Sequence, residues 1–181
     1  MPAAVVAARG AWWGKAREVP LVRESEKEAL ARTLWAETSG LERHPDEELA
    51  AIAWVARNRA AQDGATIEKV LGPPGSSKQG VWNNSTRFRE RWEAARGKPG
   101  WDRCYEVAER VLLSPSARDP IAGRNMFFHF GGLPSPDGGR CTSPRRFLMV
   151  RGGAQRCAPL WARNSPLQIG KATFTYSKSY G

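Results

Sequence analysis

Apolar positions recur with helical spacing near the start of the chain. Leu30 and Leu34 lie one turn apart, and Glu37 follows three residues later, so Glu37 continues the apolar seam of the same helix. Ser25 and Glu28, which precede this seam, have the spacing of a capping box at a helix start. The pattern therefore predicts a helix that carries one acidic side chain on its buried face.

Further helices are expected along the next 75 residues. Pro45 and the three acids after it suit a helix start. Residues 49–56 are apolar on every face, which is typical of a buried central helix, and we expect this helix to end near Arg59. Two more amphipathic helices are predicted over residues 86–95 and 101–113.

The pattern changes in the last third of the chain. Residues 126–130 have the character of a short buried strand or extended loop, and residues 147–150 and 172–176 that of strands. Glycine, proline and small polar residues predict loops over 72–85 and 131–145. The expected fold class is α+β, with a mainly helical body followed by a small β-containing C-terminal part.

The length of 181 residues fits one domain. Residues 1–24 have no clear periodicity and are expected to form a lead segment, with the domain spanning 25–181. No stretch has the roughly 20 apolar residues that cross a bilayer. The short apolar run at the start follows no basic region, so we predict no signal peptide and synthesis in the cytoplasm.

The formal net charge of +10 predicts an attraction to polyanions. Nucleic acid and the anionic bacterial envelope are the two candidate classes, and charge does not choose between them. Arg87 and Arg91 stand one helical turn apart, a spacing suited to phosphate binding, and Arg145 and Arg146 add to the basic character. A basic nucleic-acid-binding protein without catalytic activity is therefore the alternative, although no recognised nucleic-acid-binding motif is found.

The cysteines and histidines give few signals for a metal centre. His44 and His129 are far apart, and no C-x-x-C pair exists, so we expect neither a metal site nor a cofactor. Cys141 and Cys157 form either a disulfide or free thiols. Cys104 has the position of a small buried hydrophobe. Its pairing with His129, as nucleophile and base, is the weakest enzymatic alternative.

Glu37 is the sharpest chemical signal. A carboxyl group on a buried helix face is unfavourable unless it is paired or functional. Glu37 also stands at the negative end of the helix dipole, and both effects raise the pKa of the carboxyl group. A raised pKa is what a general acid needs to cleave a glycosidic bond. The alternative is a structural glutamate paired with an arginine.

Four blocks of the sequence match, in order and spacing, the motifs of one family; they are residues 31–40, 50–59, 119–128 and 160–174. They resemble the SleB-like cell wall hydrolases, the spore cortex-lytic group. The opening helix of that family presents the catalytic glutamate at the position of Glu37. The chain departs from the family pattern at residues 79–82 and at Lys171, where the family often has histidine.

The resemblance implies a lysozyme-like fold related to lytic transglycosylases, which cleave the β-1,4 bond between N-acetylmuramic acid and N-acetylglucosamine. Glu37 is then the catalytic residue. Hydrolysis normally uses a second carboxylate, and Asp119 is the best remaining candidate for it. Because Asp-Pro is also an ordinary turn opener, the single-glutamate transglycosylase mechanism is favoured over the muramidase one.

Glycan contacts are expected from the amide and aromatic side chains of Gln79, Trp82, Phe128 and Trp161. The expected partner is the peptidoglycan glycan strand, with no obligate nucleic acid, and the protein is expected to be a monomer acting at the bacterial cell wall or periplasm. A holin, a virion or a secretion system are the open delivery routes, and a phage or phage-like lysin is favoured. A non-catalytic wall-binding or virion module is a further alternative.

Overall fold

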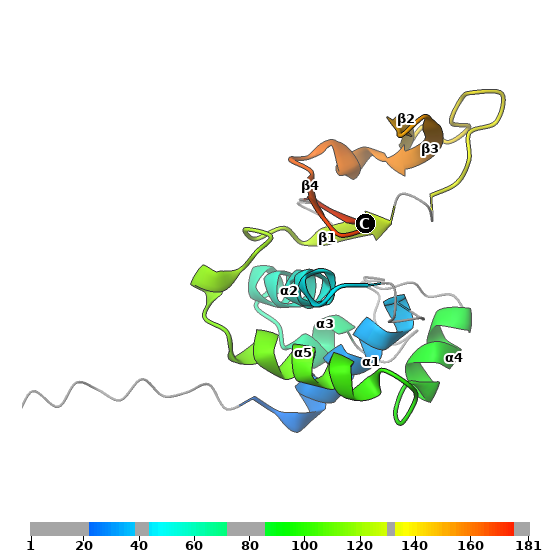
Figure 1. The fold of residues 1–181 in the computed structure, drawn as a ribbon. Coiled ribbons are helices and arrows are strands. Elements are labelled where there is room, and N and C mark those ends of the chain that lie inside the picture. Colours follow the sequence, from blue (N-terminus) through cyan, green and yellow to red (C-terminus); the bar gives the residue numbers. More distant parts are fainter. Residues whose placement is uncertain (1–21, 39–43, 72–85, 130–132, 176–181) are drawn as a thin grey trace, which may run out of the picture.

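The computed structural model describes residues 22–38, 44–71, 86–129 and 133–175. The fold is α+β and mainly helical, with small antiparallel sheets in the C-terminal part, as predicted (Figure 1). Most of the predicted lead segment and the predicted loop over 72–85 lie outside the described residues.

Five α-helices form the body of the described structure: α1 (Glu24–Thr38), α2 (Asp46–Asp63), α3 (Ile67–Leu71), α4 (Thr86–Ala94) and α5 (Trp101–Leu113). The helices α1, α2, α4 and α5 match the predicted ones closely. The five-residue helix α3 was not predicted. Within the described part of the chain, every helix is too short or too polar to cross a bilayer.

The helix α1 buries the seam that the sequence predicted, since Leu30 and Leu34 are fully buried. Its start differs from the prediction. The helix begins at Glu24, so Ser25 lies in the first turn and is not its cap. The carboxylate of Glu28 forms an ion pair with Arg32 one turn further on, at 2.8 Å, and does not serve a capping box.

The helix α2 is the central element, with residues 51–56 fully or almost fully buried. In Figure 1 it lies between the other helices and the β-containing part. It continues to Asp63, one turn beyond the predicted end, and Gly64 closes it in a left-handed conformation. Arg57 fastens α2 to the end of α5 by donating hydrogen bonds to the carbonyl oxygens of Val111 and Ser114.

The described residues of the C-terminal part form two antiparallel sheets. One has the strand order β1 (Met126–His129), β5 (Ala172–Thr175), β4 (Leu167–Ile169). The other is a ribbon of β2 (Arg146–Arg151) and β3 (Ala154–Pro159). The strands β1, β2 and β5 were predicted, whereas β3 and β4 were not. Figure 1 shows the ribbon on the side of the sheet away from the helices.

Strand β1 joins two apolar cores because its side chains alternate in direction. Phe127 stacks on Phe174, with ring centroids 6.1 Å apart, against the helical core. Phe128 is buried in a small second core with Ala158 and Ala162. The ribbon is thus attached to the sheet by apolar packing around Phe128.

The disulfide left open by the sequence is formed, and it links Cys141 to Cys157 on β3, with Cα atoms 5.6 Å apart. The two cysteines are 16 residues apart in the chain. A closed loop of this size stabilises the folded state by about 3 kcal/mol through the lost entropy of the unfolded chain. Cys104 is buried as a free thiol in α5, as predicted.

Reduction of this disulfide is expected to lower the free energy of unfolding by about 3 kcal/mol. Thermal unfolding with and without a thiol reductant measures the effect, and the double variant Cys141→Ser, Cys157→Ser serves as the control. The variant should have the melting temperature of the reduced wild type, and the reductant should not change it. Equal stability of the oxidised and reduced wild type would contradict the expectation.

Candidate active site

Glu37 is the penultimate residue of α1. Its neighbours Ala36 and Thr38 are buried, whereas Glu37 itself is partly exposed. The Thr38 hydroxyl donates a hydrogen bond to the Leu34 carbonyl oxygen at 2.7 Å and satisfies one of the free carbonyl groups at the helix end. Glu37 therefore lies at the end of a well-anchored helix, where the residue keeps part of its surface exposed although its carboxyl group is largely desolvated.

Two arginines from other helices stand near this helix end. Arg91 of α4 donates a hydrogen bond to the Ala36 carbonyl oxygen at 3.5 Å. Arg59 of α2 is almost fully buried, and it donates a hydrogen bond to the Asn125 carbonyl oxygen and contacts the Met126 sulfur. Both guanidinium groups act electrostatically on Glu37. The site is thus assembled from α1, α2 and α4 beside the start of β1.

Burial raises the pKa of Glu37 to about 7, although the positive charges of Arg59 and Arg91 lower it. The loss of hydration outweighs the attraction of the two positive charges. At neutral pH the carboxyl group is therefore close to half protonated. Such a group can give up a proton and take one back in the same pH range.

The carboxyl group of Glu37 has neither a hydrogen bond nor an ion pair with any residue whose position is described. The structural alternative required an arginine partner in direct contact. Instead, Arg91 contacts the helix backbone, and Arg59 contacts the residues that lead into β1. Among the described residues, the two arginines therefore act on Glu37 through their charge and not by direct contact.

The four predicted glycan contacts are only partly described. Gln79 and Trp82 lie outside the described residues, and so does the side chain of Trp161. Trp161 belongs to a short 3-10 helix that spans Leu160–Arg163 and follows β3. Phe128 is 8% exposed in the second core, so its ring has little surface left for a sugar. Packing explains this aromatic residue better than ligand contact does.

Asp119 has a structural role. Its carboxylate accepts hydrogen bonds from the backbone N–H groups of Ile121, at 2.9 Å, and Gly123, at 2.5 Å. It also accepts one from the Asn58 side chain on α2, at 3.0 Å. Asp119 therefore holds the turn between α5 and β1 closed.

The alternative pair of Cys104 and His129 is not supported. Cys104 is fully buried in α5, and burial raises the pKa of its thiol to about 12, so no thiolate is present at neutral pH. The imidazole of His129 contacts Glu48 instead. A cysteine nucleophile would need the reverse: exposure and a lowered pKa.

Sequence reasoning missed one cluster. His44 and His129 meet at the buried carboxylate of Glu48. Burial pushes the pKa of Glu48 upwards, but hydrogen bonds from the Lys171 backbone and from both histidines hold it below its ordinary value. The spacing of His44 and Glu48, one turn apart at a helix start, was the available signal. The contribution of His129 depends on the fold.

Comparisons with protein-family models, with curated proteins and with solved structures find no match for this chain. The resemblance to SleB-like cell wall hydrolases therefore rests on the four sequence blocks. The first of these blocks contains Glu37, the second contains Arg59, and the third contains Asp119.

Proposed function

We propose that the chain is a peptidoglycan-degrading enzyme that cleaves the β-1,4 bond between N-acetylmuramic acid and N-acetylglucosamine. Glu37 is its single catalytic carboxyl group. The observation that carries the proposal is a partly exposed glutamate, at a helix end, with a pKa of about 7. The resemblance of the surrounding helix to that of SleB-like hydrolases indicates peptidoglycan as the substrate.

The chemistry needs one group that first gives and then takes a proton. Protonated Glu37 donates its proton to the glycosidic oxygen as the bond to the muramic acid breaks. The new carboxylate is stabilised by the positive charges of Arg59 and Arg91. It then accepts the proton of the muramoyl C6 hydroxyl, whose oxygen closes a 1,6-anhydro ring. Glu37 is protonated again at the end of the cycle.

A hydrolytic mechanism needs a second carboxylate to activate water or to attack the sugar. Asp119, the candidate from the sequence, already accepts three hydrogen bonds within its own turn and from Asn58. Within the described residues, the charged groups that shift the pKa of Glu37 are two arginines and no carboxylate. These observations favour the transglycosylase over the muramidase.

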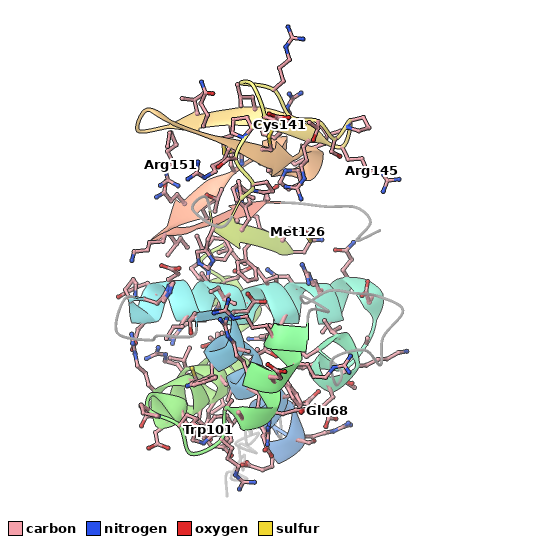
Figure 2. All side chains as sticks on the ribbon, turned by 90° about the vertical axis from the view of Figure 1, so that its right-hand side faces the viewer. Glu68, Trp101, Met126, Cys141, Arg145 and Arg151 are labelled. Atoms are coloured by element: carbon pink, nitrogen blue, oxygen red, sulfur yellow. A yellow bond between two sulfur atoms is a disulfide. The ribbon has the colours of Figure 1, made fainter. Side chains whose placement is uncertain are left out.

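The basic character supports a negatively charged target surface. Six arginines lie on the β2–β3 ribbon and its flanks: Arg140, Arg145, Arg146, Arg151, Arg156 and Arg163. Figure 2 shows Arg145 and Arg151 on opposite sides of the ribbon, far from the helices. A cationic projection of this kind attracts the anionic polymers of the bacterial envelope.

Nucleic-acid binding remains the alternative because the same arginines attract phosphate. The predicted phosphate-binding pair is weakened, since Arg91 is partly buried and contacts the backbone of α1, whereas Arg87 is exposed. Arg146 is likewise engaged, by the Cys157 carbonyl oxygen at 2.8 Å. In each of the two predicted arginine pairs, one side chain is therefore engaged within the protein, which weakens the case for phosphate binding by the pair.

Incubation of the protein with purified peptidoglycan sacculi tests the proposal. We expect soluble muropeptides to be released. A parallel titration of duplex DNA at several salt concentrations measures the alternative, because phosphate binding weakens steeply with salt. Absence of soluble muropeptides together with salt-dependent DNA binding would replace the proposal by the nucleic-acid-binding alternative.

The pH dependence of lysis is expected to have a basic limb near pH 7, because Glu37 must be protonated to act as the acid. Well above this pH, activity should fall about tenfold per pH unit. Arg91→Gln should move the limb to higher pH, since the lost positive charge had lowered the pKa of Glu37. Rates of sacculus lysis at closely spaced pH values measure both effects.

Arg87→Gln is the matched control, because Arg87 is exposed one turn before Arg91 on the same helix. It removes an equal charge without touching α1, so its limb should coincide with that of the wild type. A limb that moves equally in both variants, or to lower pH in Arg91→Gln, would contradict the assigned cause.

A further inference from the structure

His44, Glu48 and His129 form a compact cluster that plays no part in the proposed chemistry. His44 Nδ1 and His129 Nε2 each lie 2.9 Å from the same oxygen atom, Glu48 Oε1. The three potential ligand atoms all lie within 4.8 Å of one another. Glu48 is fully buried, whereas the side chains of His44 and His129 are 14% and 26% exposed. Solvent thus reaches the imidazoles but not the carboxylate.

The second oxygen of Glu48 is held from the opposite side. Glu48 Oε2 accepts a hydrogen bond from the backbone N–H of Lys171 at 2.8 Å. The preceding residue, Gly170, has no side chain, and a Cβ atom there would lie 2.1 Å from Oε2. The turn between β4 and β5 therefore fixes the carboxylate so that Oε1 faces both histidines. Metal-binding carboxylates are commonly fixed in this way by a hydrogen bond to their other oxygen.

The histidines are also held in place. The carbonyl oxygen of His44 accepts a hydrogen bond from Arg103 of α5 at 2.7 Å, which fixes the segment that precedes α2. The ring of His129 makes an edge contact with Phe127, with centroids 5.9 Å apart. Three separate segments of the chain thus converge on one point with restricted freedom.

We propose that His44, Glu48 and His129 bind a divalent transition-metal ion, with Zn²⁺ as the best fit. Two imidazole nitrogens and one carboxylate oxygen are a ligand set that zinc uses with a fourth position open to water or another ligand. Ligands at about 2.0–2.2 Å from a tetrahedral zinc lie about 3.3 Å apart. Each imidazole nitrogen lies 2.9 Å from Glu48 Oε1, and all three atoms lie within 4.8 Å of one another. Binding of the ion therefore requires side-chain movements that spread the nitrogen–oxygen pairs and set the two nitrogens at this spacing.

The metal site is separate from the Glu37 site. Glu48 and Arg59 stand about 16 Å apart along α2, at a rise of 1.5 Å per residue, and Arg59 is the residue of α2 whose charge acts on Glu37. The ion connects the start of α2 to the end of β1, and Glu48 extends this link to the β4–β5 turn. Zn²⁺ therefore joins the helical body to the sheet, and the inference holds whatever reaction Glu37 performs.

Calorimetric titration of the oxidised full chain with Zn²⁺ tests the proposal. We expect one Zn²⁺ per chain and a higher melting temperature with the ion, because a ligand that binds the folded state stabilises it. His44→Ala and His129→Ala should each weaken the affinity for Zn²⁺ by about 100-fold or more. Loss of a residue that only hydrogen-bonds to a metal ligand typically weakens the affinity by about 10- to 100-fold, so loss of a ligand itself should cost more. Glu47→Gln, an exposed carboxylate beside Glu48, is the matched control and should bind like the wild type.

Cobalt absorption spectra provide a second readout, because tetrahedral Co²⁺ bound to the wild type gives visible bands that both histidine variants should lose. Thiols do not confuse the result, since Cys104 is buried and the other two cysteines form the disulfide. Unfolding curves without metal show that each variant is folded. Absence of saturable Zn²⁺ binding by the wild type, or equal binding by wild type and both folded histidine variants, would overturn the proposal.

Discussion

Glu37→Gln is expected to reduce the rate of peptidoglycan cleavage by about 100- to 10,000-fold, the usual contribution of a general acid–base group. Glutamine keeps the size of the side chain but neither gives nor takes a proton at neutral pH. Since one carboxyl group performs both proton transfers in the proposed cycle, we expect the loss at the upper end of this range. Release of soluble muropeptides over time measures it.

The loss should not come from unfolding. The folded state disfavours ionised Glu37, because its pKa there is about 7 against an ordinary value of 4.5. Wild-type stability should therefore fall as pH rises from about 4.5 to about 7, by at most about 3 kcal/mol at 1.36 kcal/mol per pKa unit. Glu37→Gln lacks this penalty and should be at least as stable as the wild type at pH 8.

Glu24→Gln is the matched control for this variant. Glu24 is an exposed residue in the first turn of the same helix, where its carboxylate pairs with Lys27. We expect nearly full activity, because an exposed ion pair contributes little to stability. A Glu37→Gln protein that lyses sacculi at the wild-type rate would remove Glu37 from the mechanism.

Gly170→Ala is expected to lower the free energy of unfolding by about 3 kcal/mol. Gly170 has φ +58, a conformation that disfavours side chains by roughly 1 kcal/mol. The added Cβ would also displace the buried carboxylate of Glu48 from its hydrogen bonds, at a cost of about 1–3 kcal/mol. For a chain of this size the melting temperature should fall by about 6–12 °C. Thermal unfolding at fixed pH and without added metal measures the change.

Gly64→Ala separates the backbone strain from the steric contact with Glu48. Gly64 has the same φ of +58, but a Cβ there would have no neighbour within 4 Å. The backbone strain alone should lower its melting temperature by about 2–4 °C. If the two alanine variants had the same melting temperature, the close approach of Gly170 to Glu48 would contribute nothing to the loss of stability.

Helical periodicity allowed the body of the fold to be predicted. The seam of Leu30 and Leu34 and the apolar run in α2 are buried as expected, because each belongs to a helix long enough for the pattern to repeat. The predicted capping box was wrong, because the helix begins at Glu24 and Glu28 pairs with Arg32. The helix α3 was missed, since five residues hold little more than one turn.

The strands were harder to predict for a physical reason. Strand β2 packs only one side on the small second core, and Leu148 and Val150 on it are exposed. Its partner β3 begins with exposed residues and has no run of β-branched side chains. Strand β4 has only three residues. Pairing across the sheet, which the sequence does not display, defines these strands more than local preference does.

The candidate site shows the same division. Glu37 was predicted because its own helix carries the signal, whereas Arg59 and Arg91 reach it from other helices. Because His44 and His129 are far apart in sequence, no metal site was predicted. His129 nevertheless contacts Glu48 directly, across a sequence separation of 81 residues. Contacts of this separation depend on how β1 crosses α2. The sequence pattern alone does not predict that arrangement.

The central claim is that Glu37 cleaves peptidoglycan with one carboxyl group, and mass spectrometry of the digestion products tests it most directly. Sacculi digested by the wild type should release muropeptides that end in 1,6-anhydro-muramic acid, and Glu37→Gln should release none. Reducing muramic ends in place of anhydro ends would contradict the single-carboxylate mechanism and indicate hydrolysis. The absence of any soluble product from the folded wild-type protein would contradict the proposed function itself.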